Sequence, residues 1–97
     1  MKTGIAVKLQ TGFFERTAHK LKTTTKRVTF SPNAKDGDKI SIPAASIKVI
    51  TFYEAKLKME IEADDLTEAY FANADDWLDA MSALKENLSV KIICEMN

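Results

Sequence analysis

With 97 residues, 45% of them hydrophobic, the chain is long enough to bury one apolar core and too short to divide into two domains. We therefore expect a single domain that spans residues 1–97 and folds without disulfides or metal ions. The formal net charge is zero, and this balance disfavours a nucleic-acid partner.

Alternation of apolar and polar residues predicts short strands over the first two-thirds of the chain. Residues Ile5–Gln10 and Lys56–Glu62 show it most clearly, with the period of two of a half-buried strand. The Thr-rich stretch that ends at Phe30 contains β-branched residues, which favour strands over helices. The predicted strands are, in chain order, about 5–10, 17–24, 27–31, 40–42, 47–53, 56–62 and 67–71.

Turn residues separate these strands. Pro32 and Gly37 mark Ser31–Asp38 as a loop, because proline fixes φ and glycine permits positive φ. Pro43 ends the fourth strand, since it has no backbone N–H to donate. Further breaks are expected near residues 11–12, which precede Phe13-Phe14, and near 25–26, 54–55 and 63–65.

The period changes at Asn73, a favourable N-cap residue that is followed by acidic side chains in the first helical turn. Apolar residues then recur at spacings of four, three and four, which predicts an amphipathic helix over about 74–88. This stripe consists of Trp77, Met81, Leu84 and Leu88. The tail, residues 89–97, contains the apolar segment Val90–Cys94, which is interpreted either as an additional strand or as a self-association segment.

Three stretches resemble, in their order along the chain, the pleckstrin-homology-like superfamily, and within it the GRAM-like and bacterial pleckstrin-homology branch. Leu21–Phe30 is similar to a hairpin of that branch, Lys39–Val49 to its Ile-x-Ile-Pro segment, and Tyr70–Leu78 to its final strand entering a helix with an early tryptophan. The resemblance implies an α+β fold that is mainly β. It further implies a strongly bent barrel or sandwich of about seven antiparallel strands, capped by one C-terminal helix.

The charged residues are distributed unevenly. Residues 1–48 contain ten Lys/Arg and three Asp/Glu, whereas residues 49–97 contain four and eleven, so the two halves carry +7 and −7. Either the halves form different faces of a strongly dipolar molecule, or the charges interleave in space and cancel. Lys8, Lys20 and Lys22 are similar in spacing to the basic residues of pleckstrin-homology domains that bind phosphoinositides. Together with Arg16 and Lys26, which lie in the same basic stretch as Lys20 and Lys22, they are the candidate residues for anionic headgroups.

Nothing in the sequence predicts catalysis, a metal ion or a cofactor. His19 is the single histidine and is expected to be structural, on the surface or half-buried. No His or Cys residues have the spacing of zinc ligands, and the three glycines are not gathered into a phosphate-binding loop. The lone Cys94, the short apolar runs and the lack of a secretory signal predict a cytoplasmic protein without a membrane span.

The expected function is that of a non-catalytic binding module. We expect it to act through a protein partner or as a homo-oligomer, with Val90, Ile92 and Ile93 as candidate self-association residues. The alternative is peripheral binding of anionic lipid or phosphoinositide headgroups through the basic strand face, where each cation contributes about 1 kcal/mol near an anionic leaflet.

Overall fold

A computed structural model of the chain describes residues 4–10, 15–33, 37 and 39–96. The expected break at 11–12, Phe13-Phe14 and most of the loop after Asn33 lie outside these residues. The described part contains strands β1 to β8, a short 3₁₀ turn η1 and helix α1. Their bounds are β1 Ile5–Gln10, β2 Arg16–Thr23, β3 Arg27–Pro32, β4 Ile40–Pro43, η1 Ala44–Ser46, β5 Val49–Tyr53, β6 Lys58–Glu62, β7 Leu66–Tyr70, α1 Ala74–Asn87 and β8 Ile92–Glu95.

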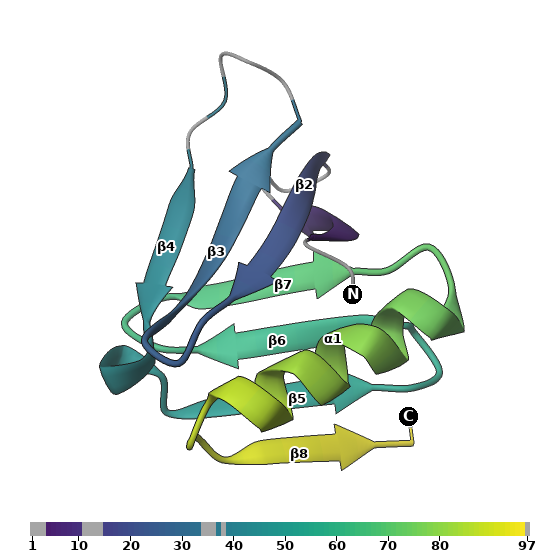
Figure 1. Cartoon of the computed structure of the whole chain (residues 1–97). Helices are drawn as coiled ribbons and strands as arrows, with labels where there is room; N and C mark the ends of the chain where they lie inside the picture. The colour runs from purple at the N-terminus through teal and green to yellow at the C-terminus, as the bar shows by residue number, and fades with distance from the viewer. Residues whose placement is uncertain (1–3, 11–14, 34–36, 38, 97) are drawn as a thin grey trace.

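The strands form one sheet in the order β4-β3-β2-β1-β7-β6-β5-β8. The sheet is strongly bent, so that β2, β3 and β4 run at a steep angle to β5, β6, β7 and β8 (Figure 1). Strands β1 to β7 pair antiparallel, whereas β8 pairs with β5 in parallel. The prediction of a mainly β fold with one C-terminal helix is therefore confirmed.

Closure of the sheet into a barrel is not confirmed. In the described part of the chain, the hydrogen-bonded order ends at β4 on one side and at β8 on the other. To close the barrel, another strand would have to pair with the edge of β5 that does not face β6. That edge is already paired with β8. The tail segment is thus an eighth strand that extends the sheet.

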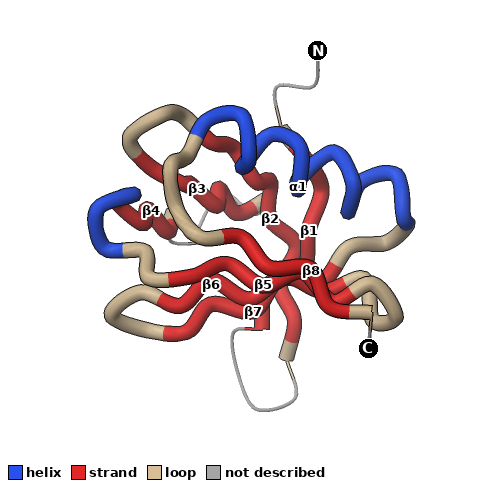
Figure 2. Tube along the Cα trace, turned by 90° about the horizontal axis from the view of Figure 1, so that it is seen from below, coloured by secondary structure: helices blue, strands red, loops and turns tan. Residues whose placement is uncertain are grey.

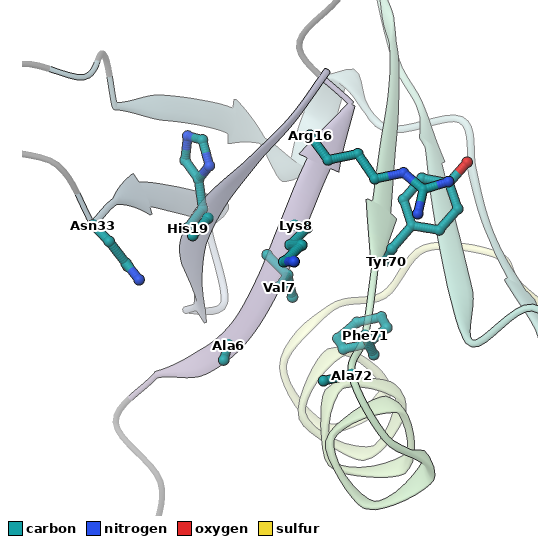
Figure 3. A pocket seen from close by; sticks show the side chains of 10 residues that line it. Ala6, Val7, Lys8, Arg16, His19, Asn33, Tyr70, Phe71 and Ala72 are labelled. Atoms are coloured by element: carbon teal, nitrogen blue, oxygen red, sulfur yellow. The ribbon is translucent and has the colours of Figure 1, made fainter. Parts of the chain in front are cut away.

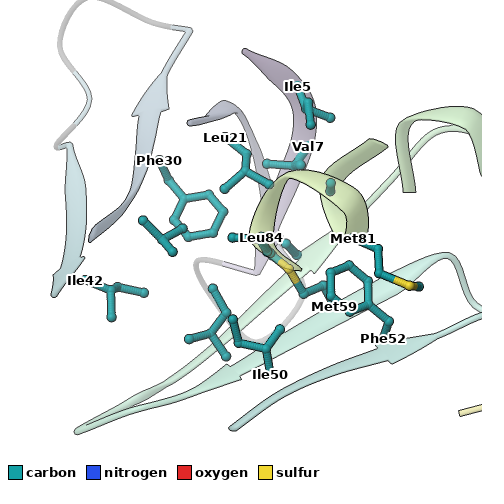
Figure 4. Close-up of a cluster of buried hydrophobic side chains, with 14 of the residues drawn as sticks. Ile5, Val7, Leu21, Phe30, Ile42, Ile50, Phe52, Met59, Met81 and Leu84 are labelled. Atoms are coloured by element: carbon teal, nitrogen blue, oxygen red, sulfur yellow. The ribbon is translucent and has the colours of Figure 1, made fainter. Parts of the chain in front are cut away.

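Strand positions follow from the alternation in the sequence, and each predicted strand is present with bounds that differ by at most two residues. Inward-facing side chains from both parts of the bent sheet meet in one core (Figure 4). The largest of those that are completely buried are Phe30, Phe52, Leu9, Ile50, Met59, Ile61, Leu84 and Val28.

Helix α1 lies on the inner face of the sheet, which carries these core side chains (Figure 2). Its N-cap is Asn73, whose side-chain oxygen accepts a hydrogen bond from the Asp76 backbone N–H at 2.8 Å. All four residues of the predicted apolar stripe are buried. The Trp77 ring packs edge-on against Phe52 at 5.8 Å, and its indole N–H donates to the Lys58 carbonyl at 3.2 Å. Helix and sheet are therefore joined by apolar packing and by the buried hydrogen bond from Trp77 to Lys58.

The turn between β5 and β6 is longer than the expected break at 54–55, because it includes residues 54–57. Leu57 ends it in the left-handed region, with φ of 49°. That conformation costs a residue with a Cβ about 1–2 kcal/mol. It is held because the Leu57 carbonyl accepts from the Phe71 N–H at 2.8 Å and the Leu57 side chain packs on the core.

Replacing Trp77 tests how far the fold depends on this helix contact. We expect Trp77→Ala to lower the free energy of unfolding by about 3–5 kcal/mol, because it removes a buried ring and leaves a cavity. The neighbouring Leu78→Ala is the matched control, since Leu78 is 51% exposed on the same helix, and its expected effect is below about 1 kcal/mol. Urea unfolding followed by circular dichroism measures both, and equal losses would contradict the packing described above.

Candidate functional site

The sheet order separates the two oppositely charged halves of the chain. Strands β1 to β4, from the basic half, are adjacent, and so are β5 to β8 from the acidic half. The halves meet where β1 pairs with β7, opposite Lys8 and Leu9. Within the sheet the strands of the two halves are therefore separated, whereas α1 of the acidic half packs against β1 and β2 of the basic half.

The structure brings together only some of the candidate basic residues. Lys20 and Lys22 lie on the outer face of β2, close to Gly4, where an added Cβ would lie 3.5 Å from carbons of both side chains. The two lysines line a hollow of about 330 Å³ together with Ser31, Pro32 and Asn33. Lys8 is exposed on the adjacent strand, opposite Ala18.

Arg16 lines a different hollow from Lys20 and Lys22, one that Lys8 also lines, and Lys26 lies apart from both pairs. The Arg16 guanidinium stacks on the Tyr70 ring, 3.6 Å from its centroid. Lys26 is exposed in the turn that follows β2, at the opposite end of that strand from Arg16. The five residues proposed from the sequence therefore do not converge on one site.

Lys58 is a buried cation. The alternation of apolar and polar residues in β6 would place it on the polar face of that strand, where exposure to solvent is expected. Its ammonium lies 2.7 Å from Glu60 and 2.8 Å from Glu68, and 9% of the residue is exposed. The rings of Tyr53 and Tyr70 cover it from the adjacent strands, at 5.7 and 5.5 Å. Burial disfavours the charged form, but the hydrogen bonds and charges of the two carboxylates outweigh it and raise the pKa of Lys58 above its ordinary value. Lys58 is therefore buried by side chains of β5 and β7, and the sequence of β6 alone does not show this.

Tyr53 belongs to the same cluster. Its hydroxyl donates to Glu60 at 3.3 Å, and burial together with this carboxylate raises the pKa of the phenol above 10.0. The Glu95 carboxylate of β8 acts in the same direction. Because folding favours the protonated phenol, its contribution to stability is complete below pH 10 and is lost as the pH rises through the raised pKa.

Removing the charge of Lys58 would leave Glu60 directly opposite Glu68 without a cation between them. We expect Lys58→Met to lower the free energy of unfolding by about 1–3 kcal/mol, through carboxylate repulsion and lost charged hydrogen bonds. Lys56→Met, in the exposed turn before β6, is the control and should change it by less than about 0.5 kcal/mol. Urea unfolding at neutral pH makes the comparison, and a stable Lys58→Met protein would show that this cluster contributes little.

The phenol of Tyr53 can be titrated alone in a Tyr70→Phe background, because the chain has two tyrosines. We expect its tyrosinate absorbance to appear with a midpoint above pH 10. Adding Glu60→Gln should lower the midpoint, whereas Glu62→Gln, at the far end of β6, should leave it unchanged. An identical midpoint in all three proteins would exclude the hydrogen bond to Glu60.

A pocket of about 320 Å³ lies where β1 and β7 diverge (Figure 3). The two strands pair over Lys8 and Leu9 alone, so Ala6 and Val7 face Phe71 and Ala72 across a gap in the ladder. His19 also lines this pocket and is 3% exposed, more deeply buried than the sequence predicts.

The side chain of His19 is held by the backbone. Its Nδ1 lies 2.8 Å from the Thr17 carbonyl, so this nitrogen carries the proton and donates it. A catalytic histidine is usually oriented by a carboxylate, and no Asp or Glu is among the described residues that line this pocket. The described residues also contain no group of three or more His, Cys, Asp or Glu that could hold a metal ion. No helix of the described part is long and apolar enough to cross a bilayer.

Strand β8 presents one edge to β5 and the other to its surroundings. The carbonyls of Lys91 and Glu95 accept hydrogen bonds from the N–H groups of Ile50 and Glu54 at 2.9 Å each. Because backbone groups point to opposite edges at successive residues of a strand, Ile92 and Cys94 direct their N–H and C=O groups to the outer edge. No strand in the described part of the chain pairs with that edge (Figure 1).

The three candidate self-association residues lie on two faces of this segment. Val90 and Ile92 are half-buried and pack against the core, whereas Ile93 is half-buried on the opposite face, beside Thr51 of β5. Cys94 and Glu95 are exposed, and Met96, just beyond β8, is the most exposed large apolar residue of the described chain at 74%. The apolar character of the tail therefore serves partly to attach it to the sheet.

The other end of the sheet is less suited to pairing. Strand β4 has four residues and ends in Pro43, which lacks an N–H group. Strand β8 is equally short but contains neither proline nor lysine, the residues that most often protect an edge. Of the two edges, that of β8 is better able to accept a further strand.

Comparison with known proteins supports the fold. No protein-family model and no curated protein matches the sequence. Among solved structures, the chain is similar to one from the Spt16D Pob3N heterodimer, with a TM-score of 0.63 at 10% sequence identity. This likeness supports a pleckstrin-homology-like fold. The match covers 97% of this chain and 56% of the other, so the chain spans little more than half the length of that protein. At this identity the likeness concerns the fold alone, and it does not distinguish the GRAM-like branch from others.

Proposed function

We propose that the chain is a non-catalytic protein-interaction module that accepts an extended segment of a partner along the outer edge of β8. The observation that carries the proposal is the row of outward-directed backbone groups at Ile92 and Cys94. An added strand would satisfy these groups, as in other cases of strand addition to a sheet edge. The exposed side chains of Cys94 and Met96 provide apolar contacts for it.

Two further features favour binding over catalysis. The solved structure that this chain resembles in fold is that of a heterodimer. In addition, the single histidine is bonded to a backbone carbonyl rather than paired with an acid or a nucleophile. We therefore propose a role that requires a protein partner and no cofactor.

A proline at position 94 tests the edge directly. Cys94→Pro removes an outward-directed N–H group, while the hydrogen bonds that Ile50 and Glu54 donate to the carbonyls of Lys91 and Glu95 remain. We expect the immobilised variant to capture at least about tenfold less of the proteins that the original chain retains from extracts of its source cells. Cys94→Ala, which keeps the N–H group and an apolar side chain, is the matched control and should capture them normally.

Thermal unfolding must show that the proline variant remains folded. Undiminished capture by a folded Cys94→Pro protein would contradict binding along this edge. If the proline variant unfolds, Ile93→Glu provides a second test, because it places a charge on the half-buried outer side chain of β8 without removing an N–H group.

A second candidate function is peripheral binding of anionic headgroups. The hollow lined by Lys20 and Lys22 favours it, because Ser31 and Asn33 line the same hollow and add polar groups to the two lysines. A hollow of this chemistry suits a phosphate group. The separation of Arg16 and Lys26 from it leaves a smaller basic site than the sequence suggests.

Vesicle flotation separates this candidate from protein binding. If the basic hollow binds headgroups, vesicles with anionic lipid retain the chain at low salt, release it at high salt, and do not retain Lys20→Glu/Lys22→Glu. The control is Lys56→Glu/Lys85→Glu, which makes the same charge change at exposed positions elsewhere. No retention at low salt would exclude the lipid function.

A further inference from the structure

We infer that the segment paired with the outer edge of β8 is β8 of a second copy of the chain, antiparallel and centred on Ile93. This inference rests on the proposed function and specifies its partner. A two-fold axis would pass between the two Ile93 residues, so that both copies use the same surface and the sheets join into one. The backbone, the charges and the apolar side chains of residues 90–96 all favour this arrangement.

The backbone first limits the alignments to three. In an antiparallel pair, hydrogen bonds form between residues whose N–H and C=O groups face each other. On the outer edge these are Ile92 and Cys94. A two-fold pairing that uses them must be centred on Ile92, Ile93 or Cys94. Centring on Ile93 joins Ile92 of each copy to Cys94 of the other, and both outward-directed residues of β8 then have partners.

The charges select among the three alignments. With Ile93 at the centre, Lys91 lies opposite Glu95 of the second copy, and this pair occurs twice. With Ile92 at the centre, Lys91 would face Ile93; with Cys94 at the centre, Glu95 would face Ile93. Opposite charges that face each other across strands stabilise an antiparallel pair. The alignment centred on Ile93 is thus the one that pairs these charges.

The apolar side chains fit the same alignment. On the inner face, Val90 and Ile92 of one copy would lie opposite Met96 and Cys94 of the other. This contact covers Met96, which is 74% exposed in the single chain. On the outer face, the two Ile93 side chains meet between the charged pairs. Residues 90–96 therefore read as apolar, positive, three apolar, negative and apolar, a pattern that complements itself when reversed.

The proposed interface between two β8 strands is small, so the method must detect weak dimerisation. A four-residue edge strand with its flanking residues buries less than the roughly 1,200 Å² of a stable interface. We therefore expect a monomer–dimer equilibrium that depends on concentration. Sedimentation equilibrium over a wide concentration range is the appropriate method for the purified chain.

Charge-reversed variants test the pairing. Lys91→Glu places like charges opposite each other twice, and so does Glu95→Lys, so each should raise the dimer dissociation constant by about tenfold or more. When the two variants are mixed, every pair again contains opposite charges. We expect a one-to-one mixed dimer, detected by native mass spectrometry with one variant isotope-labelled. Lys56→Glu and Glu86→Lys, exposed positions outside β8, are the matched controls and should dimerise like the original chain.

Cross-linking tests the alignment. In the arrangement centred on Ile93, the two Ile93 residues form a non-hydrogen-bonded pair, with Cα atoms about 4.5 Å apart, within the range of a disulfide. Ile93→Cys in a Cys94→Ser background should therefore cross-link under mild oxidation. Native Cys94 faces Ile92 of the second copy and should cross-link much more slowly. The reverse order of rates would overturn this alignment.

Failure of this inference can be distinguished from failure of the proposed function. A purified chain that stays monomeric, with no mixed dimer from the charge variants, overturns pairing with a second copy. If Cys94→Pro nevertheless abolishes capture from extracts, the edge binds a different protein and the proposed function stands. A dimer that Lys91→Glu and Glu95→Lys leave unchanged also overturns the inference, because it would form through another surface.

Discussion

Burial of the apolar stripe of α1 against the bent sheet is the constraint on which the rest of the structure depends. Trp77 links the two through its contact with Phe52 and its hydrogen bond to the Lys58 carbonyl. The helix also carries the chain back across the sheet, so that β8 emerges beside β5 and runs parallel to it (Figure 2). A parallel pair requires such a crossover connection. The edge available for binding therefore exists because the helix is packed where it is.

The outer face of the sheet has a different organisation from the core. The acidic strands enclose one cation, Lys58, between two carboxylates and two tyrosine rings. At the junction of the halves, Arg16 of the basic half stacks on Tyr70 of the acidic half. These contacts occupy charged groups that would otherwise face solvent. The basic residues that remain accessible beside one another are fewer than the sequence suggests.

Much of the fold can be predicted from the sequence, because alternation in strands and a four-three-four stripe in the helix report burial directly. The Asn73 cap and the buried Trp77 follow from such local patterns. The remaining features depend on neighbours distant in sequence. Lys58 is buried by side chains of β5 and β7, and Leu57 is held in a left-handed conformation by Phe71.

The candidate site could likewise be predicted only as far as local sequence patterns reveal it. The apolar tail is visible in the sequence, and both of its interpretations, strand and contact segment, are compatible with β8. The sequence cannot show which edge of β8 pairs with β5, because that depends on the register of a parallel ladder formed after the helix. Once this register is known, the outward-directed groups belong to Ile92 and Cys94. In an antiparallel pair of β8 strands that uses these groups, Lys91 can then lie opposite Glu95 of a second copy.

Amide hydrogen exchange, measured residue by residue at low and high protein concentration, tests the central claim most directly. The account predicts that the Ile92 and Cys94 amides exchange rapidly in the dilute protein and become protected as the concentration rises. The Ile93 amide, which points toward β5, should be protected throughout. Ile92 and Cys94 amides that are as protected as Ile93 in the dilute protein, or that exchange rapidly at every concentration, would contradict it.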